Sequence, residues 1–189
     1  MKDLKDYIRT IPDYPKKGIM FRDVTTVLSD ADGLKLAIDE MMKLLEGVDF
    51  DVIAGCEARG FICGAPLAYN LHKPFVPIRK KGKLPAATVS QAYDLEYGTA
   101  EVEIHVDAIK PGQRVVIVDD VVSTGGTLNS IIDAVRSAGA SIVDVLVPIN
   151  KDNGVSNVEP SGVKVKTLFD VTANSEGVDV SLSQDNTNE

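Results

Sequence analysis

The sequence has few thiol and imidazole side chains and no long apolar run. Among its 189 residues are two cysteines, two histidines and no tryptophan. Cys56 and Cys63 are too few for a disulfide framework and form no Cys-x-x-Cys pair, which favours buried structural thiols in a reducing, cytoplasmic compartment. His72 and His105 follow no metal-ligand spacing, and we expect both to be structural. No apolar stretch is long enough to span a bilayer, and the first residues lack the apolar run of a signal peptide.

Positive charge is scarce as well. The chain carries 28 acidic and 20 basic residues, which gives a formal net charge of −8. A surface of this sign repels nucleic acids and anionic membranes at long range, so we expect neither as a partner. An anionic substrate would therefore need a local basic site, and the candidate is the run Arg79-Lys80-Lys81-Gly82-Lys83. The alternative is a solvated basic patch, which is the usual meaning of a charge run.

The hydrophobic pattern predicts a single α/β domain. Hydrophobic residues make up 44% of the chain, enough for a sizeable core in a protein of this length. Strands are expected at 51–55, 74–79, 100–106, 114–118, 141–147 and 163–169, and helices at 4–9, 31–46, 61–71 and 127–138. Their alternation is typical of a mainly parallel sheet flanked by helices. We expect one domain over residues 1–172, in which 80–98 form a long hairpin-like excursion, followed by a polar, acidic tail over 173–189 that is frayed or disordered.

A buried strand, two carboxylates and a glycine-rich helix start follow one another over residues 115–127. The carboxyl end of a parallel strand faces the crevice where open α/β sheets bind ligands. Gly125 and Gly126 let the backbone approach a phosphate closely, and the first amides of the next helix are free to donate to it. Asp119 and Asp120 would repel a bare phosphate, but they can accept hydrogen bonds from sugar hydroxyls or approach Mg²⁺. The pattern therefore predicts a site for a sugar 5-phosphate with free vicinal hydroxyls; a strand–turn–helix with acidic caps is the alternative.

This string resembles the phosphoribosyl pyrophosphate signature of the type I phosphoribosyltransferases. Further segments, over about residues 7–139, resemble the adenine phosphoribosyltransferases of that family: Asp13-Tyr14-Pro15 to Phe21-Arg22-Asp23, Glu57-Ala58-Arg59-Gly60-Phe61, Arg79-Lys80-Lys81-Gly82-Lys83-Leu84-Pro85 and Tyr93-Asp94-Leu95-Glu96-Tyr97-Gly98. The resemblance implies a single Rossmann-like domain with a small N-terminal hood segment, residues 1–30, and a mobile loop or hairpin. It also implies an enzyme of purine salvage that transfers the 5-phosphoribosyl group of phosphoribosyl pyrophosphate (PRPP) to N9 of adenine, giving AMP and pyrophosphate. Mg²⁺ as cofactor and a homodimer are implied as well.

The resemblance assigns roles position by position. The ribose 5-phosphate of PRPP would lie against Asp119, Asp120, Ser123, Thr124, Gly125, Gly126 and Thr127. Its pyrophosphate would lie against Glu57, Ala58, Arg59, Arg79, Lys80 and Lys83, with a non-proline cis peptide at Glu57-Ala58. Adenine would be covered by Ile19, Phe21 and Arg22. Residues 80–95 would form a lid, to which Tyr97 also belongs. Mg²⁺ would be held mainly through substrate oxygens, with Asp119 or Asp120 contacting it through water.

Glu96 and Arg59 are the catalytic candidates that the resemblance implies. A carboxylate that accepts the N7–H of adenine favours the tautomer with N9 free to react, which is the role expected of Glu96. Arg59 would lie near the base and the pyrophosphate. The alternatives are an exposed hairpin glutamate and a surface ion pair.

Other functions remain open at this point, and the chain departs from the family pattern. A phosphoribosyltransferase for hypoxanthine or xanthine would need a different reader of the purine 6-position. A non-enzymatic regulator that binds PRPP would be expected to add a basic DNA-binding module. Thr26 stands where members often have proline, Ser123 replaces a usual alanine, and residues 150–189 match poorly.

Overall fold

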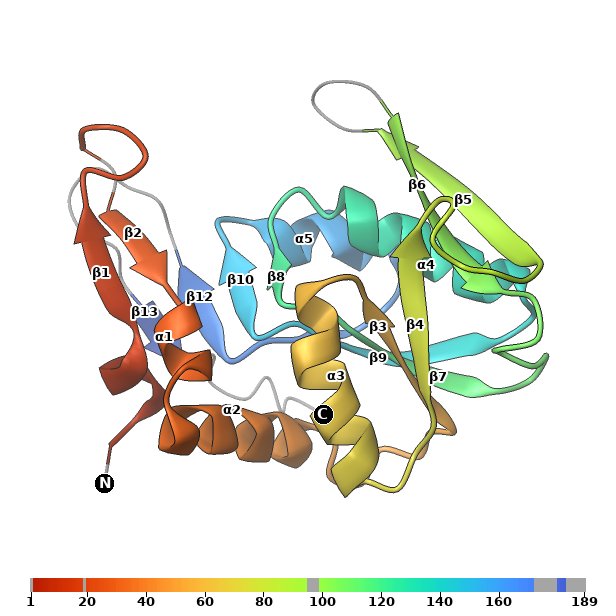
Figure 1. Ribbon diagram of the computed structural model, residues 1–189, viewed down its shortest axis with the longest axis horizontal. Helices are drawn as coiled ribbons and strands as arrows, with labels where there is room; N and C mark the ends of the chain where they lie inside the picture. The colour runs from red at the N-terminus through yellow and green to blue at the C-terminus, as the bar shows by residue number, and fades with distance from the viewer. Residues whose placement is uncertain (1, 19, 95–98, 172–179, 183–189) are drawn as a thin grey trace.

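The computed structural model describes residues 2–18, 20–94, 99–171 and 180–182 (Figure 1). Its main sheet has seven strands. From one edge to the other they are β11 (Val165–Lys166), β9 (Ser141–Leu146), β7 (Arg114–Val118), β3 (Val52–Cys56), β4 (Phe75–Lys80), β6 (Thr99–His105) and β5 (Thr88–Asp94). The first five are parallel neighbours, and β6 and β5 add an antiparallel hairpin. The predicted α/β class with a mainly parallel sheet is confirmed.

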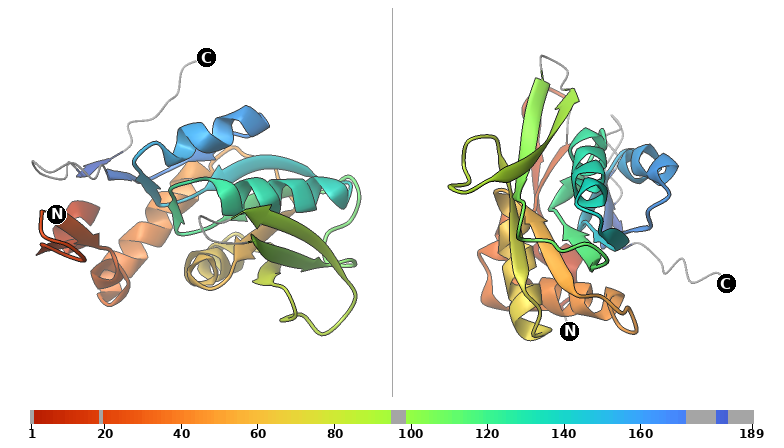
Figure 2. Two further views of the ribbon diagram at one scale, coloured as in Figure 1. Left: turned by 90° about the horizontal axis from the view of Figure 1, so that it is seen from above. Right: turned by 90° about the vertical axis from the view of Figure 1, so that its right-hand side faces the viewer.

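Helices cover both faces of the main sheet. The helices of the described ranges are η1 (Leu4–Tyr7) and η2 (Glu159–Ser161), both 3-10 helices, and α1 (Thr25–Leu28), α2 (Ala31–Leu44), α3 (Arg59–Asn70), α4 (Gly126–Ser137) and α5 (Gly154–Val158); η1 and α1 contact α2. Figure 2 shows α3 on one side of the sheet, with α4 and α5 on the other. Within the described ranges, no helix has the length and apolarity needed to cross a membrane.

The side chains of β3 alternate between two apolar cores. Val52 and Ala54 belong to the core that contains α4, whereas Ile53 belongs to the core that contains α2 and α3. All five residues of the strand are buried. A strand buried on both faces has a continuous apolar sequence without alternation, which is why β3 and β7 were predictable.

The N-terminal hood is a hairpin fastened to the domain by a threonine. β1 (Arg9–Pro12) pairs antiparallel with β2 (Met20–Asp23). The Oγ1 atom of Thr26, in α1, donates to the carbonyl oxygen of Tyr7 at 2.5 Å and accepts the N–H of Arg9 at 3.2 Å. Proline could make neither bond at this position. Thr26 is therefore structurally suited to holding the hood.

A second sheet supports the loop that follows β7, and it was not predicted from the sequence. Its four strands, in spatial order, are β13 (Val180–Leu182), β12 (Phe169–Val171), β10 (Ile149–Lys151) and β8 (Val121–Val122). Strands of two or three residues are too short to show a hydrophobic period. Because β8 comes directly after the acidic pair, this sheet holds one side of the predicted phosphate loop.

Near both ends of the chain, the structure differs from the elements predicted from the sequence. The helix predicted over 4–9 is a single 3-10 turn, and Arg9 instead begins β1. The strand predicted over 163–169 is divided between two sheets, as β11 and β12. Residues 180–182 pair with β12 as β13, so the expectation of a frayed or disordered tail does not hold for these three residues.

Candidate active site

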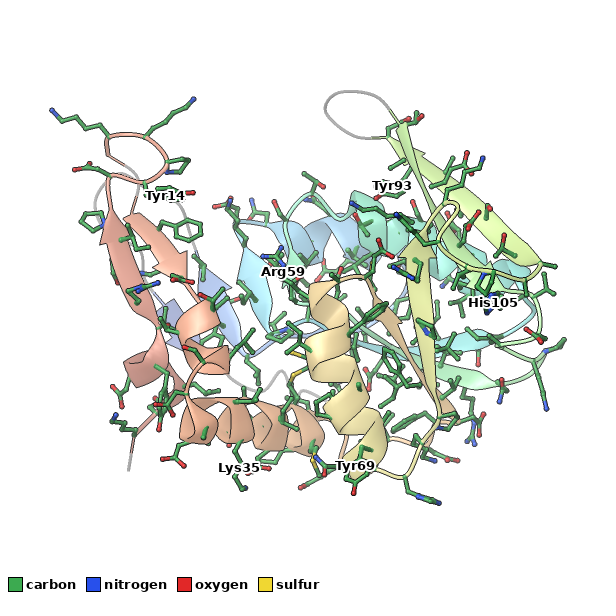
Figure 3. All side chains as sticks on the ribbon, in the orientation of Figure 1. Tyr14, Lys35, Arg59, Tyr69, Tyr93 and His105 are labelled. Atoms are coloured by element: carbon green, nitrogen blue, oxygen red, sulfur yellow. The ribbon has the colours of Figure 1, made fainter. Side chains whose placement is uncertain are left out.

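A cavity of about 430 Å³ opens at the carboxyl ends of β3 and β7, where α3 and α4 begin. Figure 1 shows where these four elements lie. Its lining consists of Cys56, Glu57, Ala58, Arg59, Lys80, Tyr93, Val102, Asp119, Asp120, Val121, Val122, Ser123, Thr124, Gly125, Thr127 and Leu128. Most residues predicted for the phosphate and pyrophosphate loops therefore meet in one place. In the view of Figure 3, Arg59 lies between Tyr14 of the hood and Tyr93 of β5.

The loop between β7 and α4 presents backbone amides. Gly125 precedes the helix with φ +81°, a conformation that glycine adopts without strain, and no side chain caps the helix start. A Cβ atom on Gly126 would lie 3.6 Å from the carbonyl oxygen of Asp94, so the end of β5 lies over this turn. An uncapped helix start bordering a cavity is suited to binding an anion.

Asp119 and Asp120 differ in burial and in partners. Asp119 is 9% exposed, and its Oδ1 accepts the N–H of Asp120 at 2.9 Å. Burial raises the pKa of Asp119 to about 7, because desolvation outweighs that hydrogen bond. The Oδ2 atom of Asp120 instead pairs with Nε of Arg59 at 2.7 Å. The pair thus offers one buried carboxyl group of raised pKa and one carboxyl group held by a cation.

The loop after β3 is tied to β4 and packed against the end of β7. It contains a cis peptide between Glu57 and Ala58, as expected. Oε2 of Glu57 accepts from Nε of Arg79 at 2.7 Å. A Cβ atom on Gly60 would lie 2.9 Å from the carbonyl oxygen of Val118, so only glycine allows α3 to begin this close to β7. The two loops that carry the predicted anion sites are therefore in direct contact.

The basic run spans the end of β4 and the turn that follows it, and its cations have different surroundings. Lys80 lines the cavity. Arg79 lies outside the lining, and besides its ion pair its Nη1 donates to the carbonyl oxygen of Lys83 at 3.3 Å. Lys83 also lies outside the lining. Lys81, whose side chain is 65% exposed, pairs with Glu101 of β6 at 2.8 Å. The end of β4 thus brings Lys80 to the cavity wall, while Arg79 and Lys83 lie outside the lining.

The hood residues lie apart from this cavity. Phe21 is 40% exposed, and its ring packs edge-on against Tyr14 with centroids 5.2 Å apart. This exposure is more consistent with a base-stacking role than with a core phenylalanine. Arg22 donates through Nη1 to Oγ1 of Thr10 within the hairpin. Three predicted site residues lie outside the described residues: Ile19, Glu96 and Tyr97.

Neither cysteine is a candidate nucleophile. Cys56 lines the cavity, but burial raises the pKa of its thiol to about 12. Burial likewise raises the pKa of Cys63 to about 11. Both thiols stay protonated near neutral pH, which agrees with a structural role.

A protein-only metal site is absent from the part of the chain that the structure describes. There, no group of three or more histidine, cysteine, aspartate or glutamate residues is placed to hold a metal ion. Mg²⁺ prefers oxygen ligands and often takes several of them from substrate phosphates and water. The donor set present, the adjacent carboxyl groups of Asp119 and Asp120, fits an ion that arrives with a substrate.

Sequence reasoning missed several contributors to the site, among them Tyr93 and Asn157. Tyr93 lies within a motif that carries the resemblance, but nothing in the motif distinguished it as a lining residue. Asn157, in α5, donates its Nδ2 to the carbonyl oxygen of Ser123 at 3.0 Å, across 34 positions of sequence. No local pattern signals a contact of that separation.

The comparisons with known proteins agree with this geometry. The model of the phosphoribosyl transferase domain matches residues 28–185. The adenine phosphoribosyltransferase of Agathobacter rectalis is 65% identical over 146 residues, which are 77% of this chain and 84% of that protein. The crystal structure of the enzyme of that name from Thermoanaerobacter pseudethanolicus has a TM-score of 0.80 at 48% identity, covering 88% of this chain and 97% of that one. The Saccharomyces cerevisiae enzyme, complexed with adenine and an imino-altritol bisphosphate, has a TM-score of 0.77 at 31% identity, covering 87% and 95%.

Proposed function

This chain belongs to the adenine phosphoribosyltransferases of the phosphoribosyltransferase family, and from that premise we propose its reaction and the roles of its residues. The reaction is the transfer of the 5-phosphoribosyl group of PRPP to N9 of adenine, giving AMP and pyrophosphate in purine salvage. The observation that carries the proposal is the composition of one cavity, which combines an uncapped helix start, an acidic pair and the loop at Glu57–Arg59. These three parts suit the phosphate, the ribose and the pyrophosphate of PRPP.

The 5-phosphate would bind at the start of α4. The amides of Gly125, Gly126 and Thr127 would donate to it, and the hydroxyl groups of Ser123, Thr124 and Thr127 would add donors. The partial positive charge of the helix start contributes about 0.3–2 kcal/mol toward such an anion. Asp119 and Asp120 would accept hydrogen bonds from the ribose hydroxyls.

Arg59 would change partners when PRPP binds. In the free protein its Nε forms an ion pair with Oδ2 of Asp120 at 2.7 Å. A ribose hydroxyl that donates to this carboxylate would take the place of the guanidinium group. Arg59 could then turn to the pyrophosphate, together with Lys80 from the cavity wall and Arg79 and Lys83 from its edge. Cations that approach the leaving group stabilise the charge that develops on it.

In the reaction, the bond between ribose C1 and the pyrophosphate oxygen breaks, and its electron pair leaves with pyrophosphate. The lone pair of adenine N9 forms the new bond to C1, and the N7 proton passes to Glu96. Carboxylates near the ribose would stabilise the positive charge that C1 carries in the transition state. Mg²⁺, bound mainly through substrate oxygens with Asp119 or Asp120 contacting it through water, would neutralise pyrophosphate charge.

The base would stack on Phe21, with Ile19 and Arg22 as further adenine-binding residues. A lid over residues 80–95 and Tyr97 would exclude water. We further propose a homodimer in the cytoplasm. Two exposed apolar side chains on one face of α3, Ile62 and Tyr69, support a partner surface, and the buried free thiols support a reducing compartment.

Product analysis tests the reaction directly. The purified protein is incubated with PRPP, Mg²⁺ and one purine at a time: adenine, hypoxanthine, guanine or xanthine. We expect AMP and pyrophosphate in equal amounts from adenine, and little product from the other bases. Nucleotide formation from a 6-oxopurine at a comparable rate would overturn the adenine assignment.

The role of Glu96 has its own test. Glu96→Gln should lower kcat by about 10²- to 10⁴-fold, the range typical of a lost acid–base group, while PRPP binding changes little. Glu101→Gln is the matched control, because it makes the same change nearby in the sequence at a carboxylate that pairs with Lys81. Near-normal turnover of the Glu96 variant would refute the role.

A further inference from the structure

We propose that helix α5 supports the phosphate-binding loop, and that Asn157 is a positioning residue for the 5-phosphate of the donor. The inference rests on the proposed function, since it concerns the loop that would bind that phosphate. It assigns a role to residues 150–158, for which the sequence analysis predicted none, although the model of the phosphoribosyl transferase domain matches the chain there.

Hydrogen bonds connect α5 to both parts of the phosphate site. The Nδ2 atom of Asn157 donates to the carbonyl oxygen of Ser123, in the loop, at 3.0 Å. The backbone carbonyl oxygen of Asn157 accepts from Nδ2 of Asn129, in the first turn of α4, at 3.2 Å. Asn157 alone therefore forms hydrogen bonds both to the loop and to α4, the helix that follows the loop.

Two glycines show how closely α5 and the loop are fitted. A Cβ atom on Gly125 would lie 3.0 Å from Cβ of Asn157. A Cβ atom on Gly154, the first residue of α5, would lie 2.4 Å from the carbonyl oxygen of Val122. The second of these contacts is with backbone, which no side-chain rotation can relieve. The loop and α5 can lie this close only because both positions are glycine.

Helix α5 is itself held in place by hydrogen bonds and by core packing. Oδ1 of Asn150, in β10, accepts the N–H of Val155, and its Nδ2 donates to Oδ1 of Asp170. Val158, the last residue of α5, is 0% exposed and packs in the core that contains α4. Figures 1 and 2 both show α5 lying beside α4. The short helix is thus held to the second sheet at one end and to the core at the other.

The contact with Ser123 controls the direction of a donor. A trans peptide is planar, so its carbonyl oxygen and the N–H of the next residue point in opposite directions. Asn157 holds the Ser123 carbonyl against α5, and the N–H of Thr124 is thereby turned away from α5. Thr124 lines the cavity. Without Asn157 this peptide, next to two glycines, could rotate and the donor would no longer be held in one direction.

Binding of separate ligands tests the inference. We compare Asn157→Ala with Ser156→Ala, a control at the neighbouring exposed position of α5, after checking that both retain the wild-type melting temperature. For Asn157→Ala, KM for PRPP and the dissociation constants of AMP and ribose 5-phosphate should rise about 3- to 10-fold, the size expected for one net hydrogen bond. The dissociation constant of pyrophosphate, and kcat, should stay within about twofold. Ser156→Ala should leave all of them unchanged.

Two further variants sharpen the test. Asn157→Asp places a carboxylate oxygen against the Ser123 carbonyl and adds negative charge beside the phosphate, so AMP should bind more weakly than to Asn157→Ala. Asn129→Ala removes the other hydrogen bond to Asn157 and should also weaken the binding of AMP.

The inference is overturned if Asn157→Ala binds AMP and PRPP as tightly as the wild type does. It is also overturned if the dissociation constants of AMP and pyrophosphate rise by the same factor. Failure of the wild type to make AMP from adenine would instead refute the proposed function. Because ribose 5-phosphate binding is measured without turnover, the two failures can be told apart.

Discussion

The buried carboxyl group of Asp119 should make the wild-type protein less stable at neutral pH than its asparagine variant. The residue is 9% exposed, and its Oδ1 accepts the N–H of Asp120 at 2.9 Å. Asparagine has the same shape, and its Oδ1 can accept the same N–H. The substitution Asp119→Asn therefore removes the ionisation while leaving the packing and that hydrogen bond in place.

The pKa of Asp119 sets the size and the pH range of the effect. In the unfolded chain the carboxyl group has its ordinary pKa of 3.8, whereas in the folded protein burial raises the pKa to about 7. Between these values the folded state keeps a proton that the unfolded state has released, so the wild type loses stability as the pH rises from about 4 to about 7. At about 1.4 kcal/mol per pH unit over about three units, the loss reaches about 4 kcal/mol above pH 7. Asp119→Asn lacks this loss.

Urea unfolding of the ligand-free proteins at pH 4, 6 and 8, followed by circular dichroism, measures the difference. The two proteins should be about equally stable at pH 4, and the variant should be more stable by up to about 4 kcal/mol at pH 8. AMP formation by the variant should fall at least about tenfold, because a neutral amide cannot stabilise the cationic ribose. A variant that is no more stable than the wild type at pH 8, or a gain that does not depend on pH, would refute the reasoning.

Three further substitutions probe other contacts. Gly60→Ala places a Cβ atom 2.9 Å from a carbonyl oxygen of β7, so we expect a stability loss of about 1–3 kcal/mol in urea unfolding and a kcat/KM at least about tenfold lower; an unchanged kcat/KM would contradict this. Arg79→Met should raise the inhibition constant of pyrophosphate about tenfold, while Lys81→Met, at a side chain that is 65% exposed, should leave it within about twofold; equal effects would count against the assignment. Lys166→Met leaves Asp144, whose side chain is 4% exposed, without its ion pair, and should cost about 3–5 kcal/mol of stability. Adding Asp144→Leu to that variant should recover most of the loss, and no recovery would show that the pair stabilises by another route.

Much of the site was predictable because its parts are neighbours in the sequence. The buried strand, the acidic pair, the glycine pair and the helix start are contiguous over residues 115–127, so strand and helix rules place them without knowledge of distant contacts. Neighbouring residues also indicate a cap for α2, either Ser29 or Asp30; in the structure Asp30 accepts the N–H groups of Asp32 and Gly33 at 3.0 Å. The short strands β8, β10 and β12 were not predictable in this way, since they are defined by pairing between distant segments within the second sheet.

The sequence by itself determined the fold class, the loop that would bind a phosphorylated ribose and the family, because these depend on hydrophobic periods and on motifs of neighbouring residues. Tertiary structure alone decided which charges meet. Asp119 and Asp120 are neighbouring residues of the same type, yet Asp119 is buried with a raised pKa whereas Asp120 pairs with Arg59. It also brought Asn157 to the phosphate loop across 34 residues. Burial and long-range contact arise only when the strands pack side by side, and no local pattern carries that information.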